Sequence, residues 1–231
     1  MDERAFVSLM SDLALDLASR PDLRSTLSAA CDASLDPTGA DGAGIFVVER
    51  GKVFAAAVAG PGMVEAELVQ IELGQGPCLS AITEREPILV TDMTAESRWP
   101  AWAEFMVSRG WSSALAVRLV DSSNATLGSL NLFSQQPDHF DWDDADVAET
   151  FAGVISAALI GSRTQEQLRQ AIAARHHVGV AQGILMQRYD LPSVEIAFEA
   201  LRRYSQDHNI KLARVADWVV EHRKLPDTPD S

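Results

Sequence analysis

The chain of 231 residues has little cysteine, and this excludes several classes of site. Its two cysteines, Cys31 and Cys78, are too few for a disulfide framework or for a zinc site of four thiolates. Neither a CxxC nor an HExxH motif occurs, and the adjacent His176 and His177 lack the i,i+4 spacing of a helical metal-ligand pair. The sequence therefore predicts no bound metal and no resident cofactor.

Long hydrophobic runs are also missing. The longest apolar stretch, from Phe151 to Ile160, is interrupted by Gly153 and Ser156, whereas a membrane-spanning helix needs about 20 apolar residues. The N-terminal residues 1–4 are acidic, and no apolar core of a signal peptide follows them. These absences predict a cytoplasmic protein that has reduced thiols and no membrane partner.

Basic residues are scarce. The chain has 19 Lys and Arg but 33 Asp and Glu, so its net charge is -14. Such a chain repels polyanions, which argues against nucleic-acid or anionic-lipid binding by the whole surface. The excess of acidic residues is unevenly distributed along the chain, however. Residues 1–165 carry all of it, whereas residues 168–224 hold nine basic and six acidic residues. The exclusion therefore applies to broad, nonspecific binding, and the C-terminal part remains a candidate for specific contact with nucleic acid.

What the chain does have is 47% hydrophobic residues, enough for a sizeable core. Up to about residue 143, helical apolar spacing alternates with short apolar runs bounded by turn residues. The predicted helices cover 5–19, 21–35, 62–72, 78–82 and 100–108, and the predicted strands cover 44–49, 53–58, 87–90, 113–120 and 126–133. Strands joined by short turns and flanked by helices predict an α+β domain around an antiparallel sheet.

From about residue 143 the pattern predicts one long helix. No proline occurs between Pro137 and Pro192, so the helix can run for about 45 residues, or about 70 Å. Apolar residues recur at alternating steps of four and three, with Gly161 and Gln165 as weak occupants: Val147, Phe151, Val154, Ala158, Leu168 and Ile172. This is a coiled-coil pattern. It favours a homodimer formed through the helix around 144–175; the alternative is a bent helix that packs on its own sheet.

Two shorter helices follow Pro192 and Asn209, which predicts an all-α, three-helix C-terminal domain. We therefore divide the chain into residues 1–160, an α+β domain whose last helix starts near 143, and residues 161–225. The Pro- and Asp-rich residues 226–231 are expected to be a disordered tail.

In this C-terminal part, small residues, Arg and Ser follow one another in an order and spacing that is specific enough to compare with known families. They are Ala174-Arg175, Val178, Ala181-Gln182-Gly183-Ile184-Leu185-Met186, Ala197-Phe198, Leu201-Arg202, Ser205, Asn209-Ile210-Lys211-Leu212 and Val215-Ala216. Residues 166–224 thereby resemble the ANTAR domain, the RNA-binding three-helix module of bacterial transcription antitermination regulators. Gln182 departs from the family, because many members have Lys there.

Residues 1–160 resemble a GAF domain, a ligand-sensing α+β fold, through the strand order and the segment Gly74-Gln75-Gly76-Pro77-Cys78. The two resemblances together imply a regulator without catalytic activity. It would bind paired stem-loops in nascent transcripts and dimerise through the linking helix. They also imply a small ligand of unidentified chemistry for the GAF-like domain.

The resemblance and the side-chain chemistry together select six candidate RNA-binding residues: Arg175, Gln182, Gly183, Arg202, Ser205 and Lys211. Arg and Lys can contact phosphate, Gln offers a donor and an acceptor to a base edge, and Gly allows close approach of a backbone. Each has a structural alternative. Gly183 would let two helices pack, Ser205 would bond a carbonyl one turn back, and Arg175 would pair with an acid across a dimer.

Two rival functions stay open. Cys78 follows a Gly-Pro loop at a predicted helix start, where the helix dipole lowers a thiol pKa, so a thiol redox enzyme using Cys78 and Cys31 is one rival. The simpler interpretation of Cys78 is a small apolar residue in a pocket wall. The other rival is a regulator whose C-terminal helices dock a protein and bind no RNA. Trp99, Trp102 and Trp111 either line a ligand pocket or, as we expect, pack in the core.

Overall fold

A computed structural model describes residues 3–226. Its contacts divide the chain into two compact units that meet between Arg163 and Thr164. The first unit is α+β and the second is all-α, which confirms the predicted fold class. Of the predicted disordered tail, 226–231, only Pro226 belongs to the described residues.

The first unit is built on one five-stranded antiparallel sheet of order β2-β1-β5-β4-β3. Its strands are β1 (Gly42–Glu49), β2 (Lys52–Ala59), β3 (Ile88–Val90), β4 (Ser113–Val120) and β5 (Thr126–Ser134). The β1–β2 hairpin closes at Arg50 and Gly51, which both have positive φ (51° and 76°). Two successive positive φ angles match the twist of the flanking strands, so Glu49 pairs directly with Lys52.

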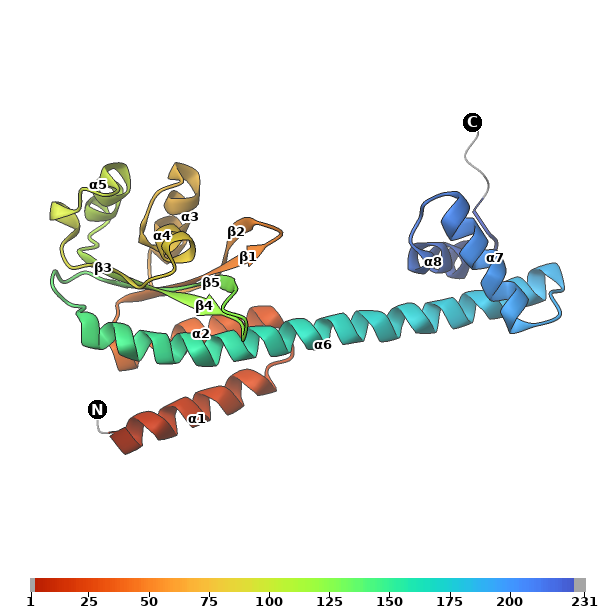
Figure 1. Cartoon of the computed structure of the whole chain (residues 1–231), viewed down its shortest axis with the longest axis horizontal. Helices are drawn as coiled ribbons and strands as arrows, with labels where there is room; N and C mark the ends of the chain where they lie inside the picture. Colours follow the sequence, from red (N-terminus) through yellow and green to blue (C-terminus); the bar gives the residue numbers. More distant parts are fainter. Residues whose placement is uncertain (1–2, 227–231) are drawn as a thin grey trace. The chain divides into compact units, whose positions relative to one another are not determined.

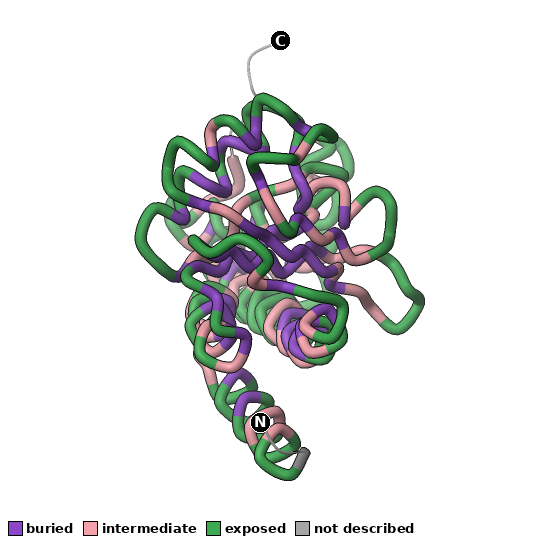
Figure 2. The backbone as a smooth tube through the Cα atoms, turned by 90° about the vertical axis from the view of Figure 1, so that its left-hand side faces the viewer, coloured by how far each residue is buried: buried purple, intermediate pink, exposed green. Residues whose placement is uncertain are grey.

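Helices cover both faces of the sheet (Figure 1). On one face lie α1 (Glu3–Ser19), α2 (Leu23–Thr38) and the first part of α6 (Trp142–Tyr189). On the other lie α3 (Met63–Leu73), α4 (Pro77–Glu84), the short 3-10 helix η1 (Met93–Ala95) and α5 (Pro100–Ser108). Successive strand residues point to opposite faces, so Ile45 and Val47 enter one core and Phe46 the other. Figure 2 shows the buried backbone concentrated along the sheet.

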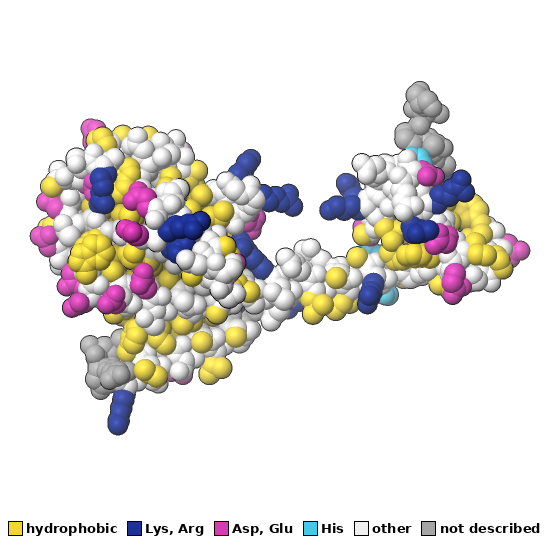
Figure 3. Space-filling view, in the orientation of Figure 1, with side chains coloured by type: hydrophobic (Ala, Val, Ile, Leu, Met, Phe, Trp, Pro, Cys, Tyr) yellow, Lys and Arg dark blue, Asp and Glu magenta, His cyan; other side chains and the backbone are white. Residues whose placement is uncertain are grey.

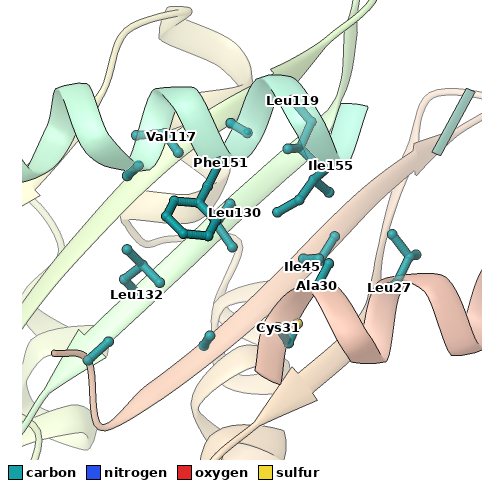
Figure 4. Close-up of a cluster of buried hydrophobic side chains, with 14 of the residues drawn as sticks. Leu27, Ala30, Cys31, Ile45, Val117, Leu119, Leu130, Leu132, Phe151 and Ile155 are labelled. Carbon is teal, nitrogen blue, oxygen red and sulfur yellow. The ribbon is translucent and has the colours of Figure 1, made fainter. Parts of the chain in front are cut away.

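Helix α6 is 48 residues long. The carboxylate of Asp141 accepts hydrogen bonds from the backbone N–H groups of Asp143 and Asp144, which caps the first turn. Within the first unit, Phe151 and Ile155 are fully buried over the sheet (Figure 4). Packing on the chain's own sheet therefore accounts for Phe151, which the heptad pattern had assigned to a dimer seam.

Beyond the first unit the apolar side chains of α6 lose this cover. Leu168 is 60% exposed and Ile172 is 61% exposed. Among the described residues, α6 alone has the length and apolar composition of a membrane span. Its apolar residues Phe151, Ile155 and Leu159 lie in a protein core instead.

The second unit consists of the C-terminal part of α6 with α7 (Val194–Asp207) and α8 (Leu212–His222). It has a small core of its own: Ala181, Leu185, Ala197, Leu201, Val215, Ala216 and Val219. The Ser193 hydroxyl accepts a hydrogen bond from the N–H of Ile196 and caps α7. Asp190 and Asn209, both with positive φ, lie in the two connections.

Candidate RNA-binding face

All six predicted RNA-binding residues belong to the second unit. Arg175, Gln182 and Gly183 lie on α6, Arg202 and Ser205 on α7, and Lys211 immediately before α8. Figure 3 shows Lys and Arg side chains on the visible surface of this unit.

Gln182 has a structural role that its sequence position did not reveal. Its side-chain Nε2 donates a hydrogen bond to the backbone carbonyl of Val194 at 3.0 Å. The bond joins α6 to the first residue of α7. A Lys at this position would place a charge where the amide now joins two helices, so the departure from the family changes the packing as well as the charge.

Ser205 also serves the fold. Its hydroxyl donates to the backbone carbonyl of Ile210 at 2.6 Å, and the N–H of Ile210 donates to the carbonyl of Ser205 at 3.0 Å. The structural alternative stated for Ser205, a bond to a carbonyl one turn back, is wrong in its partner, because the acceptor Ile210 follows Ser205 in the sequence. Asn209 has a φ of 51° and turns the chain back, which brings the carbonyl of Ile210 to the hydroxyl.

The basic candidates are accessible. The side chain of Arg202 is 52% exposed, and its NH2 group lies 2.7 Å from the carboxylate of Glu199. An exposed pair of this kind stabilises a protein by at most about 1 kcal/mol, so the guanidinium can exchange Glu199 for a phosphate at little cost. Lys211 is exposed where α8 begins. A lysine and the positive end of a helix dipole together attract anions.

The remaining two candidates lie on an open part of α6. Arg175 is exposed. Gly183 is also exposed, and a Cβ added to it would meet nothing within 4 Å. Close helix packing inside this chain therefore does not explain the glycine.

Sequence reasoning missed two aromatic pairs in the same unit. The rings of Tyr204 and His208 stack at 4.1 Å, and those of Trp218 and His222 stack at 3.7 Å. Each pair has the i,i+4 spacing that makes helical side chains neighbours, and this spacing was the signal available in the sequence.

The first unit contains a buried polar cluster under α3. The carboxylate of Glu67 accepts hydrogen bonds from Asn131 Nδ2 at 2.9 and 3.1 Å, and both residues are fully buried. Burial raises the pKa of Glu67 to about 8, although the bond from Asn131 opposes the shift. Nearby, Gln70 Nε2 lies 2.9 Å from the sulfur of Cys78, and Gln70 Oε1 accepts from the Cys78 N–H.

The two thiols are placed unfavourably for redox chemistry. Cys78 and Cys31 are fully buried, in the two different cores on opposite faces of the sheet. Burial raises the pKa of both thiols, and the nearby Glu67 adds to the shift. Desolvation thus outweighs the lowering expected at the start of α4, and Cys78 is a buried core residue whose sulfur contacts Gln70.

The three tryptophans pack as expected. Trp99, Trp102 and Trp111 are all buried in the core beneath α3, α4 and α5. Trp99 and Trp102 meet edge to face at 6.0 Å, and Trp111 packs on Phe133 at 5.8 Å.

Solved structures resemble the chain in fold. The free methionine-R-sulfoxide reductase of Neisseria meningitidis is 18% identical over 71% of this chain and 95% of its own, with a TM-score of 0.56. The GAF domain of an Acinetobacter phosphoenolpyruvate-protein phosphotransferase is 13% identical over 72% and 99%, with a TM-score of 0.55. A bacteriophytochrome of R. palustris is 14% identical over 87% and 47%, with a TM-score of 0.62.

A search of curated protein sequences found no match. Two family models do match: the GAF domain over residues 21–160 and the ANTAR domain over residues 166–220. The first covers the α+β unit from the end of α1 onward, and the second covers most of the three-helix unit. The chain therefore belongs to the GAF domain family and is a GAF–ANTAR protein, an arrangement that implies an RNA-binding antitermination regulator rather than an enzyme.

Proposed function

We propose that this protein is a cytoplasmic, signal-responsive regulator that binds paired stem-loops in nascent transcripts and lets transcription continue. The observation that carries the proposal is the ANTAR match at 166–220, which falls on a separately cored three-helix unit with exposed basic side chains. Residues 1–160 are the proposed sensor and 161–225 the proposed RNA-binding domain.

RNA contact is assigned to Arg175, Arg202 and Lys211 for phosphate, and to Gln182, Gly183 and Ser205 for closer approach. Single-stranded loops present both phosphates and unstacked base edges to such side chains. The side chains of Gln182 and Ser205 each donate one hydrogen bond to a backbone carbonyl within the fold. The charged residues are therefore the principal affinity determinants of the proposed site.

A homodimer would supply two RNA-binding domains for two stem-loops. The exposed Leu168 and Ile172 lie on one side of α6 at heptad spacing, and they support pairing with a second copy. In the proposed dimer the apolar seam begins beyond the sheet, because Phe151 is already occupied by the chain's own core.

The sensor acts on RNA binding if its ligand favours one state of the dimer. To shift the populations of two states from 1:99 to 99:1, the ligand must bind the favoured state about 10⁴-fold more tightly, a difference of about 5.5 kcal/mol. Helix α6 runs without a break from the sheet of the first unit into the second, which gives a continuous physical connection between the two.

The test is RNA binding by the full chain at several salt concentrations. The probe is chosen by selection on the wild-type protein from two-hairpin RNAs with randomised loops. Affinity should fall as salt rises, and Lys211→Ala should lower the slope of log K against log salt by about one. Lys52→Ala, an exposed lysine in the β1–β2 hairpin, is the matched control and should leave the slope unchanged. Failure to select any RNA at low salt would contradict the proposal.

A further inference from the structure

An open groove lies along the outer side of α8 and the α7–α8 connection. It measures about 630 Å³, and its lining includes Tyr204, Ile210, Arg214, Asp217, Trp218 and Glu221. Pockets for small organic molecules fall in this size range. The groove is formed entirely by the second unit and does not depend on the first.

Its walls offer flat aromatic surface. Trp218 is 40% exposed although it is a large apolar residue. Ile210, another apolar residue of the lining, is 38% exposed. The ring of Trp218 is held by the parallel ring of His222, at 3.7 Å and an interplanar angle of 8°. Tyr204 is held in the same way by His208, at 4.1 Å and 15°. Held rings of this kind lose little conformational entropy when a further ring stacks on them.

The polar lining restricts what can bind. Arg214 supplies a cation that can contact phosphate or stack on a base. Asp217 and Glu221 supply acceptors; Asp217 bonds His177 Nδ1 at 2.5 Å, whereas the side chain of Glu221 is 78% exposed. A carboxylate accepts hydrogen bonds from the exocyclic amino groups of cytosine, adenine or guanine. Uracil has no exocyclic amino group, and the single donor on its pairing edge is the ring N3–H.

The groove is continuous with the proposed RNA contact. Ile210 precedes Lys211 directly, and Arg214 lies one helical turn beyond Lys211. A phosphate held at Lys211 would therefore place its neighbouring nucleotide within reach of Trp218.

We propose that this groove receives one unpaired, amino-bearing nucleobase of the bound RNA loop, stacked against Trp218. The proposal rests on the proposed RNA-binding function and adds to it a base-specific subsite. Phosphate contacts alone would bind every loop alike, whereas this subsite makes one loop position selective for C, A or G over U.

The experiment measures binding of the selected two-hairpin RNA to the full chain. Trp218→Ala should weaken binding by about 5- to 150-fold, the effect of losing one base–aromatic stack. Trp218→Phe should retain most of the affinity, and the salt slope should stay at the wild-type value in both variants. Trp142→Ala, which removes another exposed tryptophan, in the first unit, is the matched control and should bind as wild type.

An abasic scan through the loops then locates the base. One abasic position should weaken wild-type binding by a similar factor and have little further effect on Trp218→Ala, since the two changes remove the same contact. Uracil at that position should bind wild type more weakly than C, A or G, and Glu221→Gln should reduce this preference.

The outcomes separate the two proposals. Failure to select RNA defeats the proposed function and the subsite with it. Salt-dependent RNA binding that Trp218→Ala leaves intact defeats the subsite alone, and points to a protein partner for the groove. If Trp218→Ala proves unfolded by circular dichroism, the abasic scan on wild type decides. Absence of any loop position with a fivefold or larger effect overturns the subsite.

Discussion

At the scale of single residues, burial changes the acid–base chemistry of Glu67. Its carboxyl group is fully buried, and space for it exists because position 44 is glycine. A Cβ on Gly44 would lie 1.9 Å from Glu67 Oε1. Burial raises the pKa of this carboxyl group to about 8, so it keeps its proton at lower pH. The GAF core therefore contains a carboxyl group that is largely neutral near pH 7.

This predicts a pH dependence of stability. The folded protein retains the proton of Glu67, whereas the unfolded chain releases it near the ordinary value of 4.5. Between pH 4.5 and 8 the folded state binds more protons, so the free energy of unfolding should fall as pH rises, by at most about 1.4 kcal/mol per pH unit. Glu67→Gln should flatten the dependence measured by urea unfolding from pH 5 to 8.

The control for this prediction is Glu72→Gln, an exposed residue of the same helix. It should leave the pH dependence as it is in wild type. An equally steep dependence in Glu67→Gln would show that Glu67 is ionised in the folded protein.

At the scale of elements, the α7–α8 connection shows how one side chain can serve a fold where sequence patterns suggested a ligand. Ser205 closes this connection through two hydrogen bonds to Ile210. Ser205→Ala removes one of them and should lower the free energy of unfolding of the second unit by about 1 kcal/mol. Hydrogen exchange at the Ile210 amide should report the loss as faster exchange.

Gln206→Ala, an exposed neighbour, is the control and should leave exchange at Ile210 unchanged. Unaltered exchange in Ser205→Ala together with a large loss of RNA affinity would show instead that Ser205 acts mainly as an RNA contact.

Most elements were predictable from the sequence because their signals are local. The β1–β2 hairpin follows from two apolar runs around a Gly turn, and the long helix follows from the absence of proline before Pro192. The packing of Phe151 in the chain's own core was not predictable from the sequence. A heptad position looks the same whether its side chain meets a second copy or the chain's own sheet.

At the scale of the whole molecule, the proposed dimer predicts how charges placed on α6 affect assembly. Leu168→Asp combined with Ile172→Asp places charges on the exposed seam and should shift sedimentation from dimer to monomer. Affinity for a two-hairpin RNA should fall by more than affinity for a single hairpin, since only the former gains from two linked sites.

Val107→Asp, another exposed apolar position, controls for the added charge and should leave the protein dimeric. A wild-type protein that sediments as a monomer at every concentration would refute this prediction.

The sequence by itself determined the two-part organisation, the fold class and the uneven charge, because composition and periodicity are properties of the chain alone. It also carried the order of residues that the ANTAR match recognises. Only the tertiary structure decided which polar side chains are buried or already bonded. It made Cys78 a buried core residue, gave Gln182 and Ser205 partners within the fold, and brought Tyr204 of α7 and Trp218 of α8 into one groove. Such outcomes depend on how the helices and strands pack and how their connections turn, and pKa values, hydrogen-bond partners and grooves follow from that packing.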